Sequence, residues 1–404
     1  MLPFSNGVKI LHINLVYLPA YRYGGPIKSV HNLNKWLVRK GADVTVYTTN
    51  IDGPKKLDVP TGVPVDIDGV KVFYFPIGSP RFWFYSPDFK RALAKTANDF
   101  DIIHITSVFT AATVLGRRYA EKCGKPYIIS PKGSLMDTPL GSGSFKKSLY
   151  LALIEKRNLE KADAVHFTVP NEKEEYLKRG LSFRSSFVIP NGLDPDEFKE
   201  EVPKGLFRKK FGISDDKKII LFLGRLSWIK GLDTLIPAFR KVADRIPEAV
   251  LVLAGGDDKD YKKKIEFLIS SHRLKDKVIF TGMIVDGDKQ AAFKDSDVFV
   301  MPSYSESFGM SALEAMQSGL PVVVTDGVSL APVIKVHSAG LTVHKEEREL
   351  SEALVKILSD PALAKAMGER GHEIAERDFS MSAISDRFME AYKGIIVGRS
   401  GRIN

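Results

Sequence analysis

The chain has 404 residues, of which 44% are hydrophobic and 27% are charged, and its formal net charge is +10. This composition is typical of a folded globular protein, and the length predicts two domains. Cys123 is the single cysteine, which excludes an intrachain disulfide and favours a reducing compartment. The first residues lack the features of a signal peptide, and no apolar run is long enough to cross a bilayer. We therefore expect a cytoplasmic protein.

The net positive charge of the chain comes wholly from its first half. Residues 1–190 contain 27 Lys and Arg against 16 Asp and Glu, whereas residues 191–404 contain 32 against 33. A basic half suits an anionic membrane surface, a phosphorylated acceptor or nucleic acid. Scattered solubilising charge is the alternative to all three.

Apolar runs with a strand-like or helical period alternate through the first half. Strands are expected at residues 8–16, 44–48, 70–75, 102–105 and 127–130, and helices at 27–40, 89–100 and 111–122. Residues 52–68, rich in Gly, Pro and Asp, are expected to form a loop. Strands separated by helices of this length predict βαβ units and a parallel sheet.

The same alternation restarts after Asn191 and Gly192. Strands are expected at residues 219–223, 250–254, 278–280, 298–301 and 322–325, and helices at 232–242, 259–271, 290–293, 311–317, 350–358, 361–377 and 386–396. We therefore expect an α/β fold with two parallel-sheet domains. Such domains bind ligands at the carboxyl ends of their strands.

Two cations lie in the loop that follows the first strand of the second half. Arg225 offers a bidentate fork and Lys230 a point charge, a pair that suits a diphosphate. The loop lacks the GxxxxGK[ST] pattern of a P-loop, and no dinucleotide-binding GxGxxG follows a strand. Solvated loop cations are the alternative interpretation.

Residues 301–319 lead from an apolar strand into a helix that begins among small residues. Unpaired N–H groups and the helix dipole at such a start suit a phosphate. Glu306 and Glu314 flank this start. The spacing Ser311-x-x-Glu314 also fits a capping box, in which Glu314 only satisfies a backbone donor.

Residues 81–85, with the sequence RFWFY, form an aromatic cluster beside a cation, which suits a membrane interface or a sugar-stacking surface. Lys146 and Lys147 precede the apolar residues of 149–154 and would extend such an interface as an amphipathic helix. A core-facing helix with two solvated lysines is the alternative. His104 and His166 lie in apolar, strand-like runs, where a hydrogen-bonded core histidine is commoner than a catalyst.

Together these elements resemble the family 4 glycosyltransferases, which are retaining enzymes of the GT-B architecture. The resemblance covers essentially the whole chain and implies two Rossmann-like domains facing a deep inter-domain cleft. The matching segments are Gly24-Gly25, Pro190-Asn191-Gly192-Leu193-Asp194, Gly224-Arg225-Leu226 with Lys230-Gly231, Phe280-Thr281-Gly282, and the pair Glu306 and Glu314 in an E-x7-E element. Residues 130–135 and 164–168 are similar to the subgroup that builds cell-surface polysaccharides.

The resemblance implies an acceptor-binding domain at residues 1–190, to which a C-terminal helix at about 380–397 crosses back, and a donor-binding domain at 191–379. Arg225, Lys230 and Glu306 would be catalytic, the cations holding a diphosphate and Glu306 contacting the transferred sugar. Glu314 would bind the ribose. The other implied donor-binding residues are Gly24, Gly25, Gly282, Met283, Phe308, Gly309, Met310 and Ser311. No metal and no cofactor are implied.

At the acceptor site we expect His104, Thr106 and Lys132. Many relatives carry His-x-His where this chain has His104-Ile105-Thr106, so Thr106 stands in the place of a histidine that often faces the sugar.

The implied function is transfer of a hexose-type sugar from a UDP- or GDP-sugar to a glycan or lipid-linked acceptor in cell-surface polysaccharide biosynthesis. The enzyme would be cytoplasmic, peripheral at the inner face of the cell membrane, and without a nucleic acid partner. The alternatives are a nucleotide-sugar epimerase or sugar phosphorylase of the same architecture, a non-catalytic nucleotide-sugar-binding protein, and a nucleic-acid-binding protein.

Overall fold

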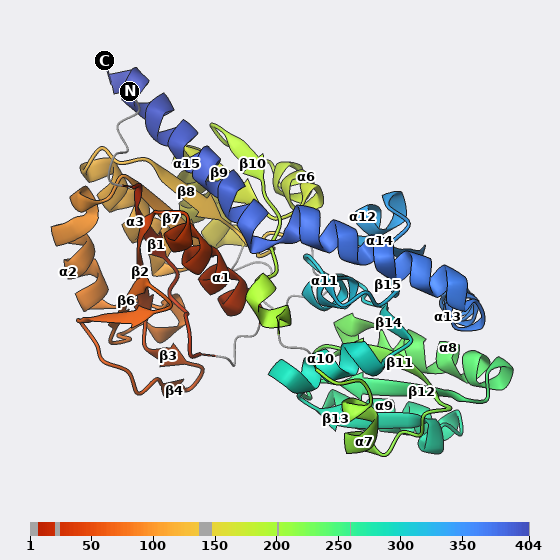
Figure 1. The fold of residues 1–404 in the computed structure, drawn as a ribbon. Helices are drawn as coiled ribbons and strands as arrows, with labels where there is room; N and C mark the ends of the chain where they lie inside the picture. Colours follow the sequence, from red (N-terminus) through yellow and green to blue (C-terminus); the bar gives the residue numbers. More distant parts are fainter. Residues whose placement is uncertain (1–6, 21–24, 137–147, 200–201, 259, 404) are drawn as a thin grey trace. The chain divides into compact units, whose positions relative to one another are not determined.

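A computed structural model describes residues 7–20, 25–136, 148–199, 202–258 and 260–403. The chain folds as two units, Met1–Gly192 with Met381–Asn404, and Leu193–Ser380 (Figure 1). In the described part of the chain, no helix is both long and apolar enough to cross a membrane. The predicted α/β architecture of two Rossmann-like units is confirmed.

The first unit is built on an eight-stranded sheet of order β10-β9-β8-β7-β1-β2-β6-β5. Its strands are β1 Lys9–Ile13, β2 Asp43–Thr49, β5 Pro64–Ile67, β6 Val70–Phe75, β7 Ile102–Thr106, β8 Tyr127–Ser130, β9 Ala164–Phe167 and β10 Ser186–Val188, and β3 Ile51–Asp52 pairs separately with β4 Lys55–Lys56. All pairs in the large sheet are parallel except β5 with β6. The expected loop at residues 52–68 is therefore wrong, because β4 and β5 lie within it.

Helices flank this sheet, and the last helix of the chain returns to it. They are α1 Gly25–Arg39, α2 Pro87–Thr96, α3 Ala111–Lys122, α5 Lys156–Lys161, α6 Pro170–Lys178 and α15 Met381–Ile403, with shorter turns η2 Arg81–Trp83, η3 Ala97–Asp99 and the π-helix η4 Leu151–Glu155. Phe388 and Tyr392 of α15 share one buried cluster with Val30 and Leu33 of α1 (Figure 1). This apolar seam makes α15 part of the first unit.

The second unit contains a wholly parallel six-stranded sheet of order β13-β12-β11-β14-β15-β16. Its strands are β11 Lys218–Leu223, β12 Ala249–Ala254, β13 Val278–Gly282, β14 Val298–Met301, β15 Val322–Thr325 and β16 Gly340–Val343. Its helices are α7 Leu206–Phe211, α8 Leu232–Arg245, α9 Tyr261–Ser271, α10 Asp286–Asp295, α11 Met310–Gln317, α12 Ala331–Val336, α13 Glu347–Ser359 and α14 Pro361–Phe379, with η5 Pro195–Phe198, η6 Trp228–Lys230 and η7 Lys275–Lys277.

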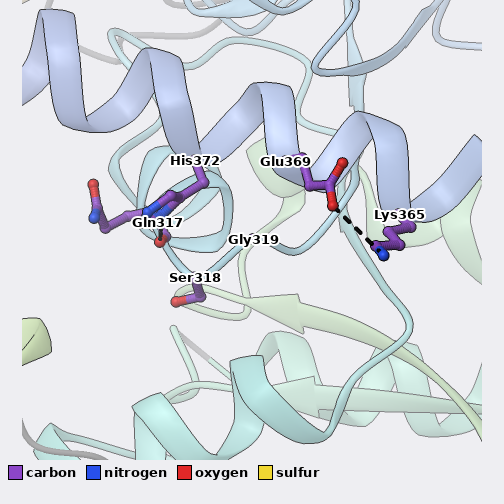
Figure 2. A pocket seen from close by; sticks show the side chains of 6 residues that line it. All are labelled: Gln317, Ser318, Gly319, Lys365, Glu369 and His372. Carbon is purple, nitrogen blue, oxygen red and sulfur yellow. Dashed lines mark hydrogen bonds and ion pairs between the residues drawn. The ribbon is translucent and has the colours of Figure 1, made fainter.

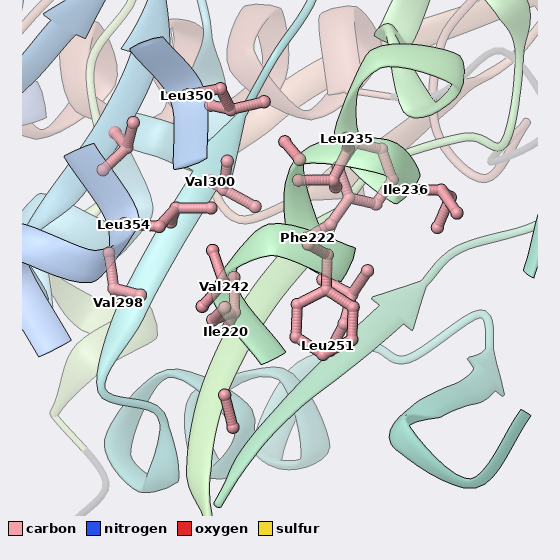
Figure 3. Packing of buried hydrophobic residues seen from close by; sticks show 14 of the residues in the cluster. Ile220, Phe222, Leu235, Ile236, Val242, Leu251, Val298, Val300, Leu350 and Leu354 are labelled. Carbon is pink, nitrogen blue, oxygen red and sulfur yellow. The ribbon is translucent and has the colours of Figure 1, made fainter. Parts of the chain in front are cut away.

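The core of the second unit forms where the apolar stripe of α8 packs against the sheet (Figure 3). Leu235 and Ile236 of α8 pack in one buried cluster with Ile220 and Phe222 of β11. Leu350 and Leu354, one turn apart on α13, belong to the same cluster. The apolar residues of α8 recur every three or four positions, so one face of the helix is buried. This packing holds β11 at the centre of the sheet.

The strand order of the second unit creates a switch point beside β11. The chain runs outward from β11 to β12 and β13, then returns to β14 on the other side of β11. The connections that follow β11 and β14 therefore both begin at this switch point on the carboxyl edge of the sheet, which is where open α/β sheets bind ligands.

Candidate active site

The loops after β11 and β14 are joined at the switch point by backbone contacts. The N–H of Tyr304 donates to the carbonyl oxygen of Ile229 over 2.8 Å. Gly231 has φ of 68°, and a Cβ placed on it would lie 2.0 Å from the carbonyl oxygen of Pro302. Only glycine fits both the left-handed backbone and this close approach. The loop geometry thus brings residue 230 against the loop that carries residue 306.

Lys230 and Glu306 form an ion pair at this crossing, and the side chain of each is 18% exposed. The backbone of Glu306 is held by the loop after β15, since its N–H donates to the carbonyl oxygen of Gly327 over 2.9 Å. A cation and a carboxylate are therefore fixed together at the strand ends. A lysine ammonium has three N–H donors, so it can bind a carboxylate and an anionic ligand at once.

Helix α11 begins at Met310, with Gly309 as its N-cap at φ of 106°. A Cβ on Gly309 would lie 2.9 Å from a methyl carbon of Val328. The hydroxyl of Ser311 donates to the carbonyl oxygen of Leu223 over 2.9 Å and makes no cap. The capping-box alternative is therefore wrong, because residue 311 lies inside the helix. The N–H groups of the first two residues of a helix have no acceptor within it, whereas that of Ala312 donates to the carbonyl oxygen of Gly309 over 3.0 Å.

Glu314, one turn further along α11, pairs with Lys289 of α10 over 2.8 Å. Their side chains are 14% and 17% exposed. Lys289 was missed at the sequence level, because α10 is weakly amphipathic and no motif singles out this lysine. The tertiary structure brings α10, which connects β13 to β14 along the chain, against α11 through this ion pair.

Arg225 follows β11 and its side chain is 66% exposed. The backbone beside it is anchored, since the N–H of Leu226 donates to the carbonyl oxygen of Gly256 over 2.8 Å. The guanidinium lies 3.8 Å from a carboxylate oxygen of Asp258. It remains accessible to a ligand at the strand ends.

The other expected donor-binding residues lie in different settings. Gly282 closes β13, and Met283 is 77% exposed. The ring of Phe308 is buried against Phe379, with ring centroids 6.1 Å apart, so only its backbone can meet a ligand. Gly25 opens α1 in the first unit. Gly24 lies outside the described residues.

His104, one of the expected acceptor residues, lies inside the core of the first unit. Its ring is buried, stacks on His12 at 4.4 Å, and has Tyr392 and Ser130 within 2.7 and 2.6 Å of its two nitrogens. Burial, with His12 nearby, holds the pKa of His104 well below its usual value. Thr106 is also buried, and its hydroxyl lies 2.7 Å from the second ring nitrogen of His12. These residues form a polar network inside the core.

Lys132, the third expected acceptor residue, is half-buried. It follows β8, and its ammonium donates to the side-chain oxygen of Asn191 over 2.9 Å. Burial lowers its pKa to about 8, and the nearby carboxylate of Glu172 opposes that shift. This amine loses its charge more readily than a surface lysine.

The buried histidines predict acid sensitivity. Burial lowers the pKa of His12 from 6.5 to about 4, and the pKa values of His104 and His166 are also lowered. Between these pH values the unfolded chain binds more protons, so the free energy of unfolding should fall as pH drops from 6.5 toward 4. Urea unfolding followed across this range checks the fall. A His344→Gln control, which removes an exposed histidine, should keep it, and a flat profile would contradict the prediction.

No three His, Cys, Asp or Glu side chains gather into a cation-binding group within the residues that the structure describes. Arg225 and Lys230 follow β11, and Lys289 of α10 adds a third positive charge beside α11.

Two family models match the chain. The model described as glycosyl transferases group 1 matches residues 203–374. The model described as glycosyl transferase 4-like domain matches residues 24–192. The chain belongs to the group 1 glycosyltransferases. The first model spans both the Lys230–Glu306 and the Lys289–Glu314 pair, so the candidate site lies in the part of the chain that the family shares.

This glycosyltransferase is similar to three further proteins along nearly its whole length. It is 28% identical to an uncharacterised glycosyltransferase of Methanocaldococcus jannaschii, over 96% of this chain and 98% of that protein. Sucrose-phosphate synthase of Thermosynechococcus elongatus is 25% identical, with a TM-score of 0.78 over 97% of this chain and 100% of the other. HepE of Anabaena, solved in complex with UDP-glucose, is 20% identical, with a TM-score of 0.74 over 96% and 99%. At 20% identity, the similarity to HepE shows a shared fold.

A shallow hollow lies at the opposite end of α11 from the site of this glycosyltransferase (Figure 2). Gln317 and Ser318 line it from α11, and His372 donates to the carbonyl oxygen of Gln317 over 2.6 Å. Lys365 and Glu369 of α14 pair with each other over 3.8 Å at its rim. The charged groups of this hollow, Lys365 and Glu369, are 78% and 67% exposed, unlike the largely buried pairs at the other end of α11.

Proposed function

We propose that this glycosyltransferase moves a hexose-type sugar from a UDP- or GDP-sugar to a glycan or lipid-linked acceptor, with retention at the anomeric carbon and without a metal. It would act in cell-surface polysaccharide biosynthesis, in the cytoplasm at the inner face of the membrane. The observation that carries the proposal is the pair of lysine–carboxylate contacts, Lys230–Glu306 and Lys289–Glu314, on either side of the start of α11. The UDP-glucose complex of HepE supports a nucleotide-sugar donor.

In this proposal the donor lies across the strand ends of the second unit. Arg225 and Lys230 neutralise the diphosphate, and the N–H groups at the start of α11 add the positive end of the helix dipole. Glu306, held beside Lys230, accepts hydrogen bonds from hydroxyl groups of the transferred sugar. Glu314 accepts hydrogen bonds from the ribose hydroxyls, and Lys289 fixes the direction of the Glu314 carboxylate.

The chemical step needs no protein base. The acceptor hydroxyl attacks the anomeric carbon on the face that the diphosphate leaves. The bond from this carbon to the diphosphate oxygen breaks as the new C–O bond forms, and the departing phosphate oxygen takes the acceptor's proton. The protein contributes positioning and stabilises the developing charge of the diphosphate.

A phosphorylated sugar is the second candidate acceptor. The first unit carries the whole basic surplus of the chain, and Lys132 lies at the end of β8 in that unit. Sucrose-phosphate synthase, by its name, makes a sugar phosphate, and it resembles this chain along nearly all of its length. A basic acceptor domain would suit either a phosphosugar or a lipid diphosphate.

The decisive experiment is a donor screen followed by an acceptor-dependent assay. Thermal shifts with UDP, GDP, ADP and their sugars identify the donor, because a ligand that binds only the folded state raises its apparent stability. Release of the nucleoside diphosphate should then require an acceptor, and the product should keep the anomeric configuration of the donor by NMR. The rate should be unchanged by EDTA. Turnover without an acceptor, or an inverted product, would contradict the proposal.

Replacing Lys289 with methionine should weaken binding of the nucleoside diphosphate about tenfold, or ~1.4 kcal/mol. The reason is that Glu314 loses the ion pair that orients its carboxylate toward the ribose. Calorimetric titration measures the affinity. Lys210→Met is the matched control. Lys210 of α7 pairs over 2.6 Å with Asp288, the chain neighbour of Lys289 on α10, and this pair is exposed. Equal affinities in both variants would argue against the role of Lys289.

A further inference from the structure

Large apolar side chains are exposed in two segments of the first unit. Phe82 in η2 is 82% exposed, Leu153 in η4 is 70% exposed, and Leu149 just before η4 is 48% exposed. Solvent-exposed apolar residues are ordinary when single, but a contiguous group marks an interaction surface.

A hydrogen bond joins the two segments that carry these side chains. The indole N–H of Trp83 donates to the hydroxyl of Tyr150 over 2.7 Å. Phe82 and Leu149 are the chain neighbours of these two residues, and Leu153 lies one helical turn beyond Leu149. The Trp83–Tyr150 bond thus brings the segment of Phe82 beside the segment of Leu149 and Leu153, and these five residues are here called the aromatic face.

The outward direction of the aromatic face is fixed from below by Glu155. Its buried carboxylate accepts hydrogen bonds from the N–H of Phe109 and the hydroxyl of Thr113, each over 2.7 Å. Asn158 donates to the other carboxylate oxygen over 3.1 Å. Because these contacts hold the inner side of the helix, Leu153 stays on the outer side. A core-facing helix, the alternative considered from the sequence, is therefore wrong for Leu149 and Leu153.

Basic side chains follow the exposed leucines on the next turn. Lys156 and Arg157 are both exposed. The unit that carries them also holds the entire positive surplus of the chain. Trp and Tyr with a polar tip and an apolar body, next to exposed Leu and Phe and flanked by cations, is the pattern of a protein surface that lies at a lipid headgroup boundary.

We infer that the aromatic face docks on a bilayer that contains anionic lipids, with Phe82, Leu149 and Leu153 entering the interface and Lys156 and Arg157 meeting the headgroups. The positive charge decides for a lipid surface over an uncharged apolar partner, since anionic lipids attract basic residues near the surface. The inference deepens the proposed function, which places a lipid-linked acceptor at the membrane. Docking itself requires neither donor nor turnover.

The test measures co-sedimentation of the full chain with phosphatidylcholine vesicles, with and without phosphatidylglycerol. The native protein should bind the anionic vesicles. The double variant Phe82→Ser with Leu153→Ser should bind them at least about tenfold more weakly, because two interfacial apolar side chains are lost. Lys156→Glu with Arg157→Glu should lower binding to anionic vesicles by a similar factor. Phe267→Ser is the matched control, as this phenylalanine is 73% exposed in the second unit, and its binding should be unchanged.

Other outcomes overturn the inference. Native protein that ignores anionic vesicles, or binds neutral ones equally well, rules out a headgroup-directed docking face. Loss of a dimer in the Phe82→Ser, Leu153→Ser variant on size exclusion, with vesicle binding intact, would make the face an interface between copies of the chain. Nucleotide thermal shifts on the same variants show that each is folded. They also separate failure of membrane docking from failure of the proposed transferase function.

Discussion

Replacing Lys230 with methionine is expected to lower kcat/KM for the donor about a thousandfold, or ~4 kcal/mol. The ammonium lies beside Glu306 at the switch point, where the proposed diphosphate leaves. Methionine keeps most of the length of the side chain but removes the charge that stabilises the departing group. The variant also leaves Glu306 without its partner in a position that is only 18% exposed, which adds repulsion toward the diphosphate. Steady-state kinetics with the donor identified by thermal shift measures the effect.

Lys241→Met provides the control for this experiment. Lys241 pairs with Glu347 over 2.9 Å on the outer helices of the same unit, and its side chain is 50% exposed. Surface pairs of this kind contribute at most about 1 kcal/mol, so both activity and stability should stay close to native. A Lys230 variant as active as this control would remove the diphosphate role from Lys230, and with it the main support for the proposed donor site.

Replacing Gly231 with alanine is expected to lower the free energy of unfolding by about 2–4 kcal/mol and to abolish most activity. Two costs add at this position. The left-handed φ of 68° disfavours any residue with a Cβ, and that Cβ would lie 2.0 Å from the carbonyl oxygen of Pro302. The loops after β11 and β14 must separate to relieve the contact, which pulls Lys230 away from Glu306. Urea unfolding and kinetics on one preparation measure both effects.

Gly212→Ala separates the two costs. Gly212 has nearly the same φ, 65°, at the end of α7, but no heavy atom lies within 4 Å of a Cβ built there. Its variant should lose only about 1 kcal/mol, the cost of the left-handed backbone, and should keep its activity. If the two alanine variants were equally stable, the close approach to Pro302 would carry no energetic weight.

The strands that the sequence predicts correctly are those whose apolar runs are continuous. β6, β8, β14 and β15 have the predicted bounds, and the buried face of α8 has the predicted period. β5, β10 and β16 were missed, and each is an edge strand of its sheet. An edge strand packs on fewer neighbours, so short and partly polar segments suffice, and periodicity has little to detect.

The functional contacts were less accessible from the sequence. The pattern indicated Arg225, Lys230, Glu306 and Glu314 as separate candidates, but neither ion pair could be read from it. Lys230 lies 76 residues from Glu306, and only the adjacency of β11 and β14 brings them together. Lys289 gave no signal at all, since its relevance comes from a partner on another helix.

Two local patterns left alternatives open that only a tertiary partner could decide. Ser311 and Glu314 have the spacing of a capping box, yet the hydroxyl of Ser311 bonds to β11 and the carboxylate of Glu314 pairs with α10. His104 stands where relatives place a pair of strand-end histidines, yet α15 supplies Tyr392 to its ring. In each case a tertiary partner from a distant segment took the polar group.

The sequence by itself determined the two α/β units, the strand-end loops and the family, because periodicity, turn residues and motif spacing are local properties of the chain. Only the tertiary structure decided which charges face each other, which histidine is buried, and which aromatic residues lie at the surface. These depend on strand order and on the return of α15, where residues far apart in sequence become neighbours and compete for the same polar partners. Side-chain pairing at the switch point is therefore a property of the folded sheet, and no spacing along the chain encodes it.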